Sequence, residues 1–68
     1  MTNSLRQHRE QKRMTQEQLA DAVGVSRQSI ISVEKGQYVP TTVLALKLSS
    51  ILKLPVEELF QLDNRDWQ

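Results

Sequence analysis

The amino-acid sequence predicts an all-α fold, a compact bundle of five helices in a single domain. Apolar residues recur at the three- and four-residue intervals of a helix, and no stretch alternates apolar and polar residues as a half-buried strand would. Helix-capping residues and two glycines divide the 68 residues into five short segments. A chain of this length forms one domain at most.

The first two helices are predicted by residues that cap helix N-termini. Asn3 or Ser4 can cap a first helix that runs to about Arg13. Thr15 opens the sequence TQEQ, a capping box in which a threonine is followed three residues later by a glutamine. The box predicts that a second helix covers residues 16–23.

A tight corner separates the second helix from the third. Gly24 ends the second helix, because glycine enters the left-handed backbone region without a steric penalty. Ser26 then caps a third helix over residues 27–35, which Gly36 ends. Two helices joined through so short a link must cross closely.

The last two helices follow a loop at residues 37–40. Thr41 or Thr42 caps a fourth helix that ends near Lys53. Pro55 suits the first turn of a shorter fifth helix, Val56–Gln61, and the polar residues after Leu62 are expected to be loose.

One hydrophobic core is expected to hold the helices together, with one face of the fourth helix turned toward it. That inner face comprises Leu44, Ala45, Leu48, Ile51 and Leu52. The predicted core comprises Leu5, Leu19, Ala20, Val23, Val25, Ile30, Val33, Leu44, Leu48, Leu52, Leu59 and Phe60.

Composition argues against several classes of function. The chain has no cysteine and one histidine, so we expect no metal site, no catalytic relay and no cofactor, and therefore no enzyme. No run approaches the ~20 apolar residues that cross a membrane, and no secretion signal is evident, which favours a cytoplasmic protein. We also expect no second domain for a small-molecule effector.

Charge is distributed unevenly although the formal net charge is only +1. Residues 1–40 carry six basic and four acidic side chains, whereas residues 41–68 carry three basic and four acidic side chains. An anionic partner would therefore meet the N-terminal half.

The third helix presents an unusual outward face. On a helical wheel of about 100° per residue, its outward side chains fall within an arc of about 140°. They are Arg27, Gln28, Ile31, Ser32 and Lys35. Arginine can bind guanine O6 and N7, glutamine can pair with adenine N6 and N7, and an apolar side chain can cover a thymine methyl group. The face therefore suits the major groove of DNA, although a solvent-exposed polar surface would also account for it.

The spacing Gln16-x3-Ala20-x3-Gly24-x5-Ile30-x2-Val33 is that of a helix-turn-helix motif at residues 16–35. Together with the flanking segments LRQHREQKRMTQEQLA, VEKGQYVP and LALKLSSILKLPVEELF, it resembles the Cro/CI-type (Xre-like) helix-turn-helix transcriptional regulators. The resemblance covers residues 5–59 and leaves residues 60–68 as a C-terminal tail. It implies the fold of a phage-repressor DNA-binding domain.

The resemblance also implies roles for individual residues. It assigns base contacts to Arg27, Gln28 and Ser32. Ile31 departs from the family, which commonly has a polar residue there, and either touches a thymine methyl group or is simply exposed. Contacts to the sugar-phosphate backbone are implied for Gln16, Ser26, Lys35 and Tyr38. Ser26 can reach a base instead, and Tyr38 can instead simply pack the loop. Arg13 stands where the family often has glycine or another small residue, and it either adds a phosphate contact or is simply exposed. Arg9 and Glu34 match a structural ion pair between the first and third helices.

Apolar residues near the C-terminus can close the base of the domain itself, but there are more of them than one thin bundle needs, which suggests that a second copy of the chain packs there. They are Val56, Leu59, Phe60 and Leu62. We expect the protein to be a homodimeric transcriptional regulator that binds a palindromic operator in double-stranded DNA. We expect it to act as a repressor rather than as an activator. Two alternatives stay open: a DNA-binding antitoxin that docks a toxin around Val43, Leu46 or Trp67, and an interaction module that has kept the fold.

Overall fold

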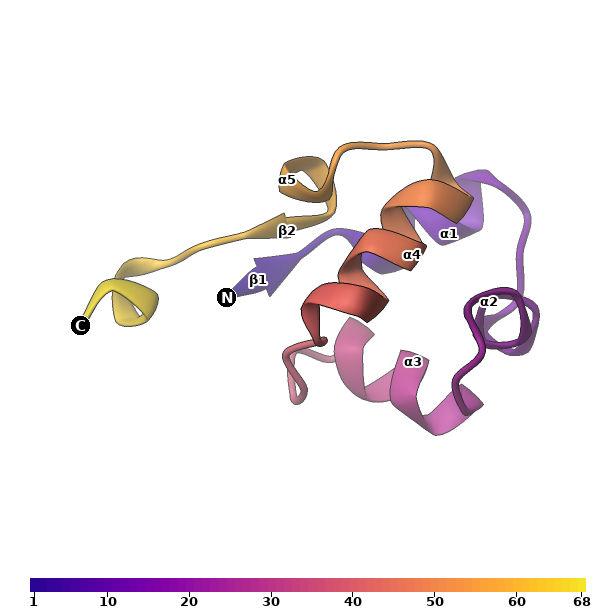
Figure 1. The fold of residues 1–68 in the computed structure, drawn as a ribbon, viewed down its shortest axis with the longest axis horizontal. Helices are drawn as coiled ribbons and strands as arrows, with labels where there is room; N and C mark the ends of the chain where they lie inside the picture. The colour runs from indigo at the N-terminus through magenta and orange to yellow at the C-terminus, as the bar shows by residue number, and fades with distance from the viewer.

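Five α-helices form most of the computed structural model, which describes residues 1–68 (Figure 1). They are α1 (Leu5–Gln11), α2 (Gln16–Val23), α3 (Arg27–Glu34), α4 (Thr42–Leu52) and α5 (Val56–Leu59). Two short strands, β1 (Thr2–Asn3) and β2 (Phe60–Gln61), and the 3-10 helix η1 (Asn64–Trp67) complete the chain. The predicted all-α class is confirmed, with a small sheet added.

Side-chain caps begin the helices around the predicted corner. The Thr15 hydroxyl accepts a hydrogen bond from the backbone N–H of Gln18 at 3.0 Å, and the Gln18 side chain accepts one from the Thr15 N–H at 2.8 Å. Ser26 and Thr41 cap α3 and α4 in the same manner, each accepting from the N–H three residues later. The predicted capping box and both caps are confirmed.

Four residues adopt the left-handed backbone conformation where helices end or the chain turns. Gly24 and Gly36 have φ of 76° and 75°, as their positions after α2 and α3 predict. Arg13 and Lys53 both have φ of 57°, a conformation that is costly for residues other than glycine. Arg13 therefore lies outside α1, which ends at Gln11, earlier than expected.

The two ends of the chain pair in a small antiparallel sheet. Thr2 lies opposite Gln61, and Asn3 lies opposite Phe60. The fifth helix, expected to continue to Gln61, therefore ends at Leu59, and the following two residues form β2. The expectation of an entirely helical chain was wrong at this point. The expectation of a loose tail was also wrong, because residues 64–67 form η1.

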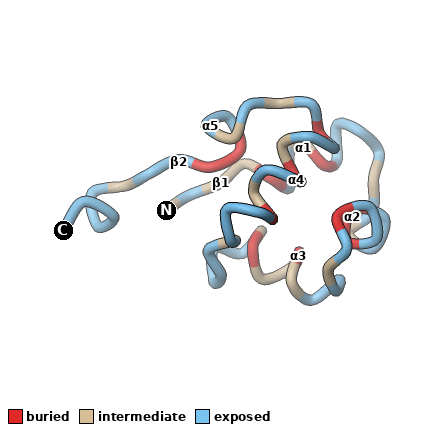
Figure 2. The backbone as a smooth tube through the Cα atoms, viewed as in Figure 1, coloured by how far each residue is buried: buried red, intermediate tan, exposed pale blue.

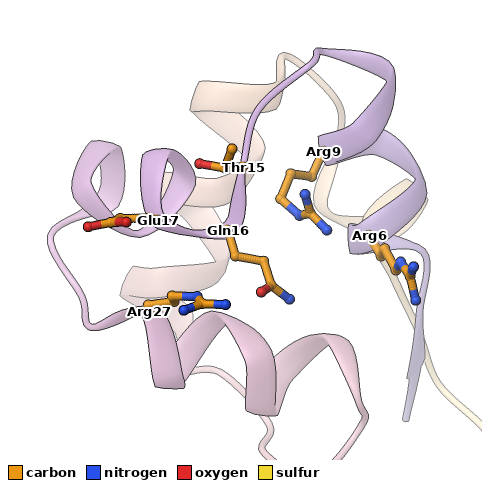
Figure 3. Close-up of a pocket in the computed structure, with 6 residues that line it drawn as sticks. All are labelled: Arg6, Arg9, Thr15, Gln16, Glu17 and Arg27. Atoms are coloured by element: carbon orange, nitrogen blue, oxygen red, sulfur yellow. The ribbon is translucent and has the colours of Figure 1, made fainter.

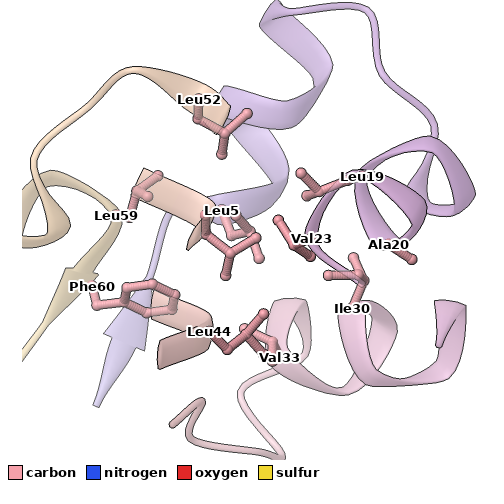
Figure 4. Close-up of a cluster of buried hydrophobic side chains, with 11 residues drawn as sticks. Leu5, Leu19, Ala20, Val23, Ile30, Val33, Leu44, Leu52, Leu59 and Phe60 are labelled. Carbon is pink, nitrogen blue, oxygen red and sulfur yellow. The ribbon is translucent and has the colours of Figure 1, made fainter. Parts of the chain in front are cut away.

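Eleven buried apolar side chains form one cluster between the helices (Figure 4). It contains every predicted core residue except Val25, which is partly buried and packs against the cluster. Ile51, predicted on the inner face of α4, is instead exposed. The buried backbone segments face the centre of the bundle, while the outer side of α3 and the C-terminal residues face solvent (Figure 2).

Candidate nucleic-acid interface

The corner between α2 and α3 sets the direction of the third helix, whose inner side chains Ile30 and Val33 reach the core. The backbone N–H groups of Gly24 and Val25 both donate to the Ala20 carbonyl, at 2.9 and 3.0 Å, which closes the end of α2. Ala20 is buried where the helices approach, and Ile30 fills the space between them. As a result α3 lies along one edge of the molecule, with no other element covering its outer side (Figure 1).

The side chains predicted to contact bases lie on this uncovered side. Arg27 and Gln28 are exposed, whereas Ile31 and Ser32 are half-buried. The Gln28 side-chain amide donates to the Ser32 hydroxyl at 3.4 Å, so these two groups lie together on one face of the helix. Both amide and hydroxyl keep further hydrogen-bonding capacity for a ligand.

A buried ion pair fixes α3 to α1. Arg9 Nε lies 2.6 Å from Glu34 Oε2, and Arg9 Nη2 donates to Glu34 Oε1 at 3.3 Å. The two side chains expose only 9% and 5% of their surface. Arg9 Nη1 also donates to the Met14 carbonyl at 2.8 Å, so the guanidinium is hydrogen-bonded on all three nitrogens.

The first turn of α2 joins this network through Gln16. Its side-chain amide donates to Glu34 Oε1 at 3.1 Å. Glu34 therefore accepts hydrogen bonds from both Arg9 and Gln16, and it holds α1, α2 and α3 in one arrangement. Gln16 retains a second amide hydrogen and its oxygen for other contacts.

A polar hollow of about 560 Å³ lies beside this network, between α1 and the first turns of α2 and α3 (Figure 3). No hydrophobic residue lines it; its residues are Arg6, Arg9, Thr15, Gln16, Glu17 and Arg27. Figure 3 shows the Gln16 side chain reaching into the space between α1 and α3, with Arg27 extending toward it. The N-terminal ends of α2 and α3 both border the hollow, and their dipoles favour a negatively charged ligand.

Arg6 is the cation of this hollow that was not predicted from the sequence, and the exposed Glu17 was not predicted there either. Arg6 Nε lies 3.6 Å from Glu10 Oε1 in an exposed pair, so its guanidinium is loosely held. The signal that could have found it is its spacing of three residues from Arg9, which places both arginines on one face of α1. Because Arg9 is paired with Glu34, the cations of this hollow that remain available to bind an anion are Arg6 and Arg27.

A second polar hollow, of about 390 Å³, lies against α3 and the loop that follows it. Its residues are Ser26, Gln28, Ser29, Ser32, Gln37 and Tyr38. Ser29 and Gln37 were not anticipated, and the Ser29 hydroxyl lies 3.1 Å from that of Ser26. Lys35 and Tyr38 are exposed near the end of α3, and Arg13 is exposed at the turn between α1 and α2.

The predicted dimer surface is only partly on the outside. Leu59 has no exposed surface and Phe60 exposes 7%, because both belong to the core of their own chain. Leu62 is exposed and Val56 is half-buried. Two hollows near these residues share Met1, Val56 and Phe60, so one continuous, largely apolar surface covers this part of the molecule.

The N-terminal ammonium group joins the two ends of the chain. Met1 N lies 3.0 Å from Asp63 Oδ2 and 3.0 Å from Asp66 Oδ2. The hydrogen bond to Asp66, followed by that to Asp63, raises the pKa of the Met1 ammonium. The hydrogen bond from the ammonium in turn lowers the pKa of the Asp63 carboxyl.

Two further features are absent from the structure. No group of three histidine, aspartate or glutamate side chains lies close enough together to hold a metal ion. None of the helices is both long enough and apolar enough to cross a membrane.

Comparison with known proteins places this geometry in a family. A family model described as Helix-turn-helix matches residues 5–59. The chain belongs to the Cro/CI-type helix-turn-helix transcriptional regulators. An uncharacterized HTH-type transcriptional regulator of Methanothermobacter thermautotrophicus is 44% identical over 64 residues, which are 93% of each chain. The HTH-type transcriptional regulator YgzD of Bacillus subtilis is 36% identical over 66 residues, which are 97% of this chain and 100% of that one.

A solved structure supports the same assignment. The restriction-modification controller protein C.AhdI from Aeromonas hydrophila is similar to this helix-turn-helix regulator with a TM-score of 0.76 and 39% sequence identity. The match covers 82% of this chain and 85% of the controller protein. Family and fold therefore agree that the chain is a DNA-binding regulator, with α2 and α3 as its helix-turn-helix.

Proposed function

We propose that this regulator binds a palindromic operator as a homodimer and represses transcription, with α3 of each protomer in the major groove. It acts by binding rather than by catalysis, on DNA in the cytoplasm. The observation that carries the proposal is the uncovered outer side of α3, where Arg27 and Gln28 are exposed beside two polar hollows.

Base recognition is assigned to the N-terminal half of α3. Arg27 can donate two hydrogen bonds to guanine O6 and N7, and Gln28 can bind adenine N6 and N7. Ser32 adds a hydroxyl beside Gln28. Ile31 is half-buried, so the remaining exposed part of its side chain offers an apolar contact to a thymine methyl group.

Groups around α3 are assigned to the sugar-phosphate backbone. The polar hollow presents Arg6 together with Gln16, and the other end of α3 presents Lys35 and Tyr38. Ser26, at the cap of α3, and Arg13, at the turn before α2, are the remaining candidates. Such contacts fix the position of a protein on the duplex, whereas base contacts give sequence preference.

A dimer follows from the symmetry that repressors of this type use. In dimeric phage repressors, two recognition helices enter successive major grooves about 34 Å apart. A two-fold symmetric protein then requires a palindromic site. Repression follows where that site overlaps a promoter, because bound protein and polymerase cannot occupy the same DNA.

Selection of bound duplexes from a random pool tests this function. We expect a palindrome with half-sites one helical turn apart to be enriched. Arg27→Ala should change the preferred base at one position in each half-site, while Ser50→Ala, at an exposed position on α4, serves as a control that keeps the wild-type preference. Enrichment of a single, non-symmetric half-site would contradict the dimer, and no enrichment at all would contradict sequence-specific binding.

A further inference from the structure

Residues 62–68 form an arm that projects from the body of the domain. In Figure 1 the chain leaves β2 and runs away from all five helices, and η1 ends at the far extremity of the molecule. The arm carries two large exposed apolar side chains, Leu62 and Trp67. Trp67 exposes 77% of its surface, so its own chain does not cover it.

The arm is nevertheless held in a defined conformation. The Asp63 carboxylate accepts a hydrogen bond from the Arg65 N–H at 2.9 Å, and the Asp66 carboxylate accepts one from the Asp63 N–H at 2.8 Å. The Met1 ammonium bonds to both carboxylates. An exposed tryptophan on a fixed support loses little conformational freedom when it binds, which favours its use as a contact residue.

An apolar hollow of about 210 Å³ lies on the same continuous surface, at the base of the arm. Its residues are Met1, Val39, Pro40, Thr42, Ala45, Leu46, Val56 and Phe60. None of them has a charged side chain. Val39 and Leu46 expose 63% and 57% of their surface, so the hollow is open to a partner.

We propose that the arm of one protomer packs across a second copy of the chain, with Trp67 in the partner's apolar hollow. The inference rests on the proposed homodimer and specifies how its two copies are held together. In a two-fold dimer the exchange is reciprocal, so each dimer contains two such contacts.

Charge favours a second copy as the occupant. Two-fold symmetry brings the same surface of both protomers together, so a charged side chain near the axis would lie opposite the same charge on the partner and repel it. No charged side chain lines the hollow, and the Met1 ammonium at its edge is already paired with the two arm carboxylates. The formal net charge of +1 per chain adds little repulsion.

The arm also supplies area that a stable dimer needs. Covering a tryptophan removes about 150–250 Å² from solvent. With 77% of its surface now exposed, Trp67 would contribute on the order of 150 Å² to a standard interface of about 800 Å² per protomer. Tryptophan is also among the residues that most often dominate the binding energy of an interface.

The sequence supplies its own probe, because Trp67 is the one tryptophan of the chain. We expect its fluorescence to shift to shorter wavelength and to become resistant to iodide quenching as concentration rises. The shift should follow the same midpoint as the change in mass measured by sedimentation velocity. A dimer in which Trp67 remains fully open to iodide would overturn the arm contact while leaving the homodimer intact.

Two single variants test the contact from each side. Trp67→Ala removes the arm side chain, and Leu46→Asp places a charge in the hollow; each should weaken the dimer by about 30-fold or more. Arg65→Ala is the matched control, because its side chain lies on the same short helix and is almost fully exposed. Unchanged dimer affinity in Trp67→Ala would refute the proposal.

Mixing the two variants distinguishes exchange between copies from packing within one copy. A mixed dimer keeps one intact contact, between the hollow of the Trp67→Ala chain and the arm of the Leu46→Asp chain. We therefore expect the mixture to dimerise more tightly than either variant alone, whereas packing within each copy predicts no recovery. Wild-type protein that stays monomeric at every concentration would contradict the homodimer itself, and Trp67 protection only by an added protein would favour the alternative of a different docking partner.

Discussion

Replacing Glu34 by glutamine removes the negative charge from the network that joins α1, α2 and α3 while keeping the size of the side chain. Glu34 accepts hydrogen bonds from Arg9 at 2.6 and 3.3 Å and from Gln16 at 3.1 Å. In Glu34→Gln the buried Arg9 guanidinium loses its counter-charge, and the new amide hydrogens face donors rather than acceptors. Both native side chains are at least nine-tenths buried, so solvent screens the loss only slightly.

The expected cost is large for a domain of this size. Removing one partner of a buried ion pair costs about 3–5 kcal/mol. A 68-residue domain is stabilised by roughly 3–10 kcal/mol at about 0.05–0.15 kcal/mol per residue. Glu34→Gln should therefore remove a third or more of the free energy of unfolding, and at the low end of that range the domain should be largely unfolded.

Urea denaturation followed by circular dichroism measures this loss. Glu10→Gln is the matched control, because Glu10 pairs with Arg6 at 3.6 Å in an exposed position where such pairs contribute about 0.3–0.5 kcal/mol. The double variant Arg9→Met/Glu34→Leu should be more stable than Glu34→Gln, since it leaves no uncompensated charge. A loss below about 1 kcal/mol in Glu34→Gln, or a double variant no more stable than the single one, would refute the reasoning.

Four further predictions concern DNA binding, assembly and pH. Arg27→Ala should weaken operator binding by about 1–3 kcal/mol and relax the preference at one base position; an equal loss on all sequences would instead make Arg27 a phosphate contact. Lys35→Gln should reduce the slope of log affinity against log salt by roughly one, and an unchanged slope would contradict a phosphate contact. Leu62→Asp should yield folded monomers in sedimentation velocity, because Leu62 is exposed on the apolar surface, whereas a persistent dimer would place the interface elsewhere. The clamp between Met1 and Asp63 should hold from about pH 4 to about pH 8. Above that pH window the clamp is lost as the Met1 ammonium, whose pKa is raised, deprotonates. Below that window the clamp is lost as the Asp63 carboxylate, whose pKa is lowered, is protonated. Trp67 fluorescence anisotropy that stays constant across both limits would count against the clamp.

Local signals made α2 and α3 predictable. A capping box at Thr15, a serine cap at Ser26 and a glycine after each helix act within a few residues, so their effect is visible in sequence. The bounds of α2 were predicted to the residue, and α3 ends at Glu34, one residue before the predicted end.

Long-range pairing was not predictable in the same way. Strands β1 and β2 contain two residues each and lie at opposite ends of the chain, so neither shows the alternation that marks a strand. Their pairing is what ends the fifth helix early and directs the arm outward. The end of α4 near Lys53 was predicted, but the left-handed backbone conformation of Lys53 was not, because a lysine carries no local signal for that conformation.

In the candidate site, too, features set by local sequence were predictable, whereas features set by the packing of distant segments were not. The outward face of α3 follows from helical periodicity, so Arg27 and Gln28 were placed correctly on the surface. The polar hollow depends on how α1 packs beside α2 and α3, which periodicity does not specify, and Arg6 was therefore missed. The same limit applies to Leu59, whose apolar character suits a core and an interface equally well.

Charge placement explains how a chain with a net charge of +1 can bind a polyanion. Half of its eight acidic side chains lie in residues 57–66, in α5 and the arm, which are remote from α3 in Figure 1. Glu34, the acidic residue within α3, is buried against Arg9 and is therefore neutralised toward DNA. The remaining exposed charge on and beside α3 includes Arg27, Lys35 and Arg6. Local potential at the recognition helix, rather than the net charge, therefore determines the electrostatic attraction. The network that stabilises the fold also neutralises the one carboxylate of α3 itself.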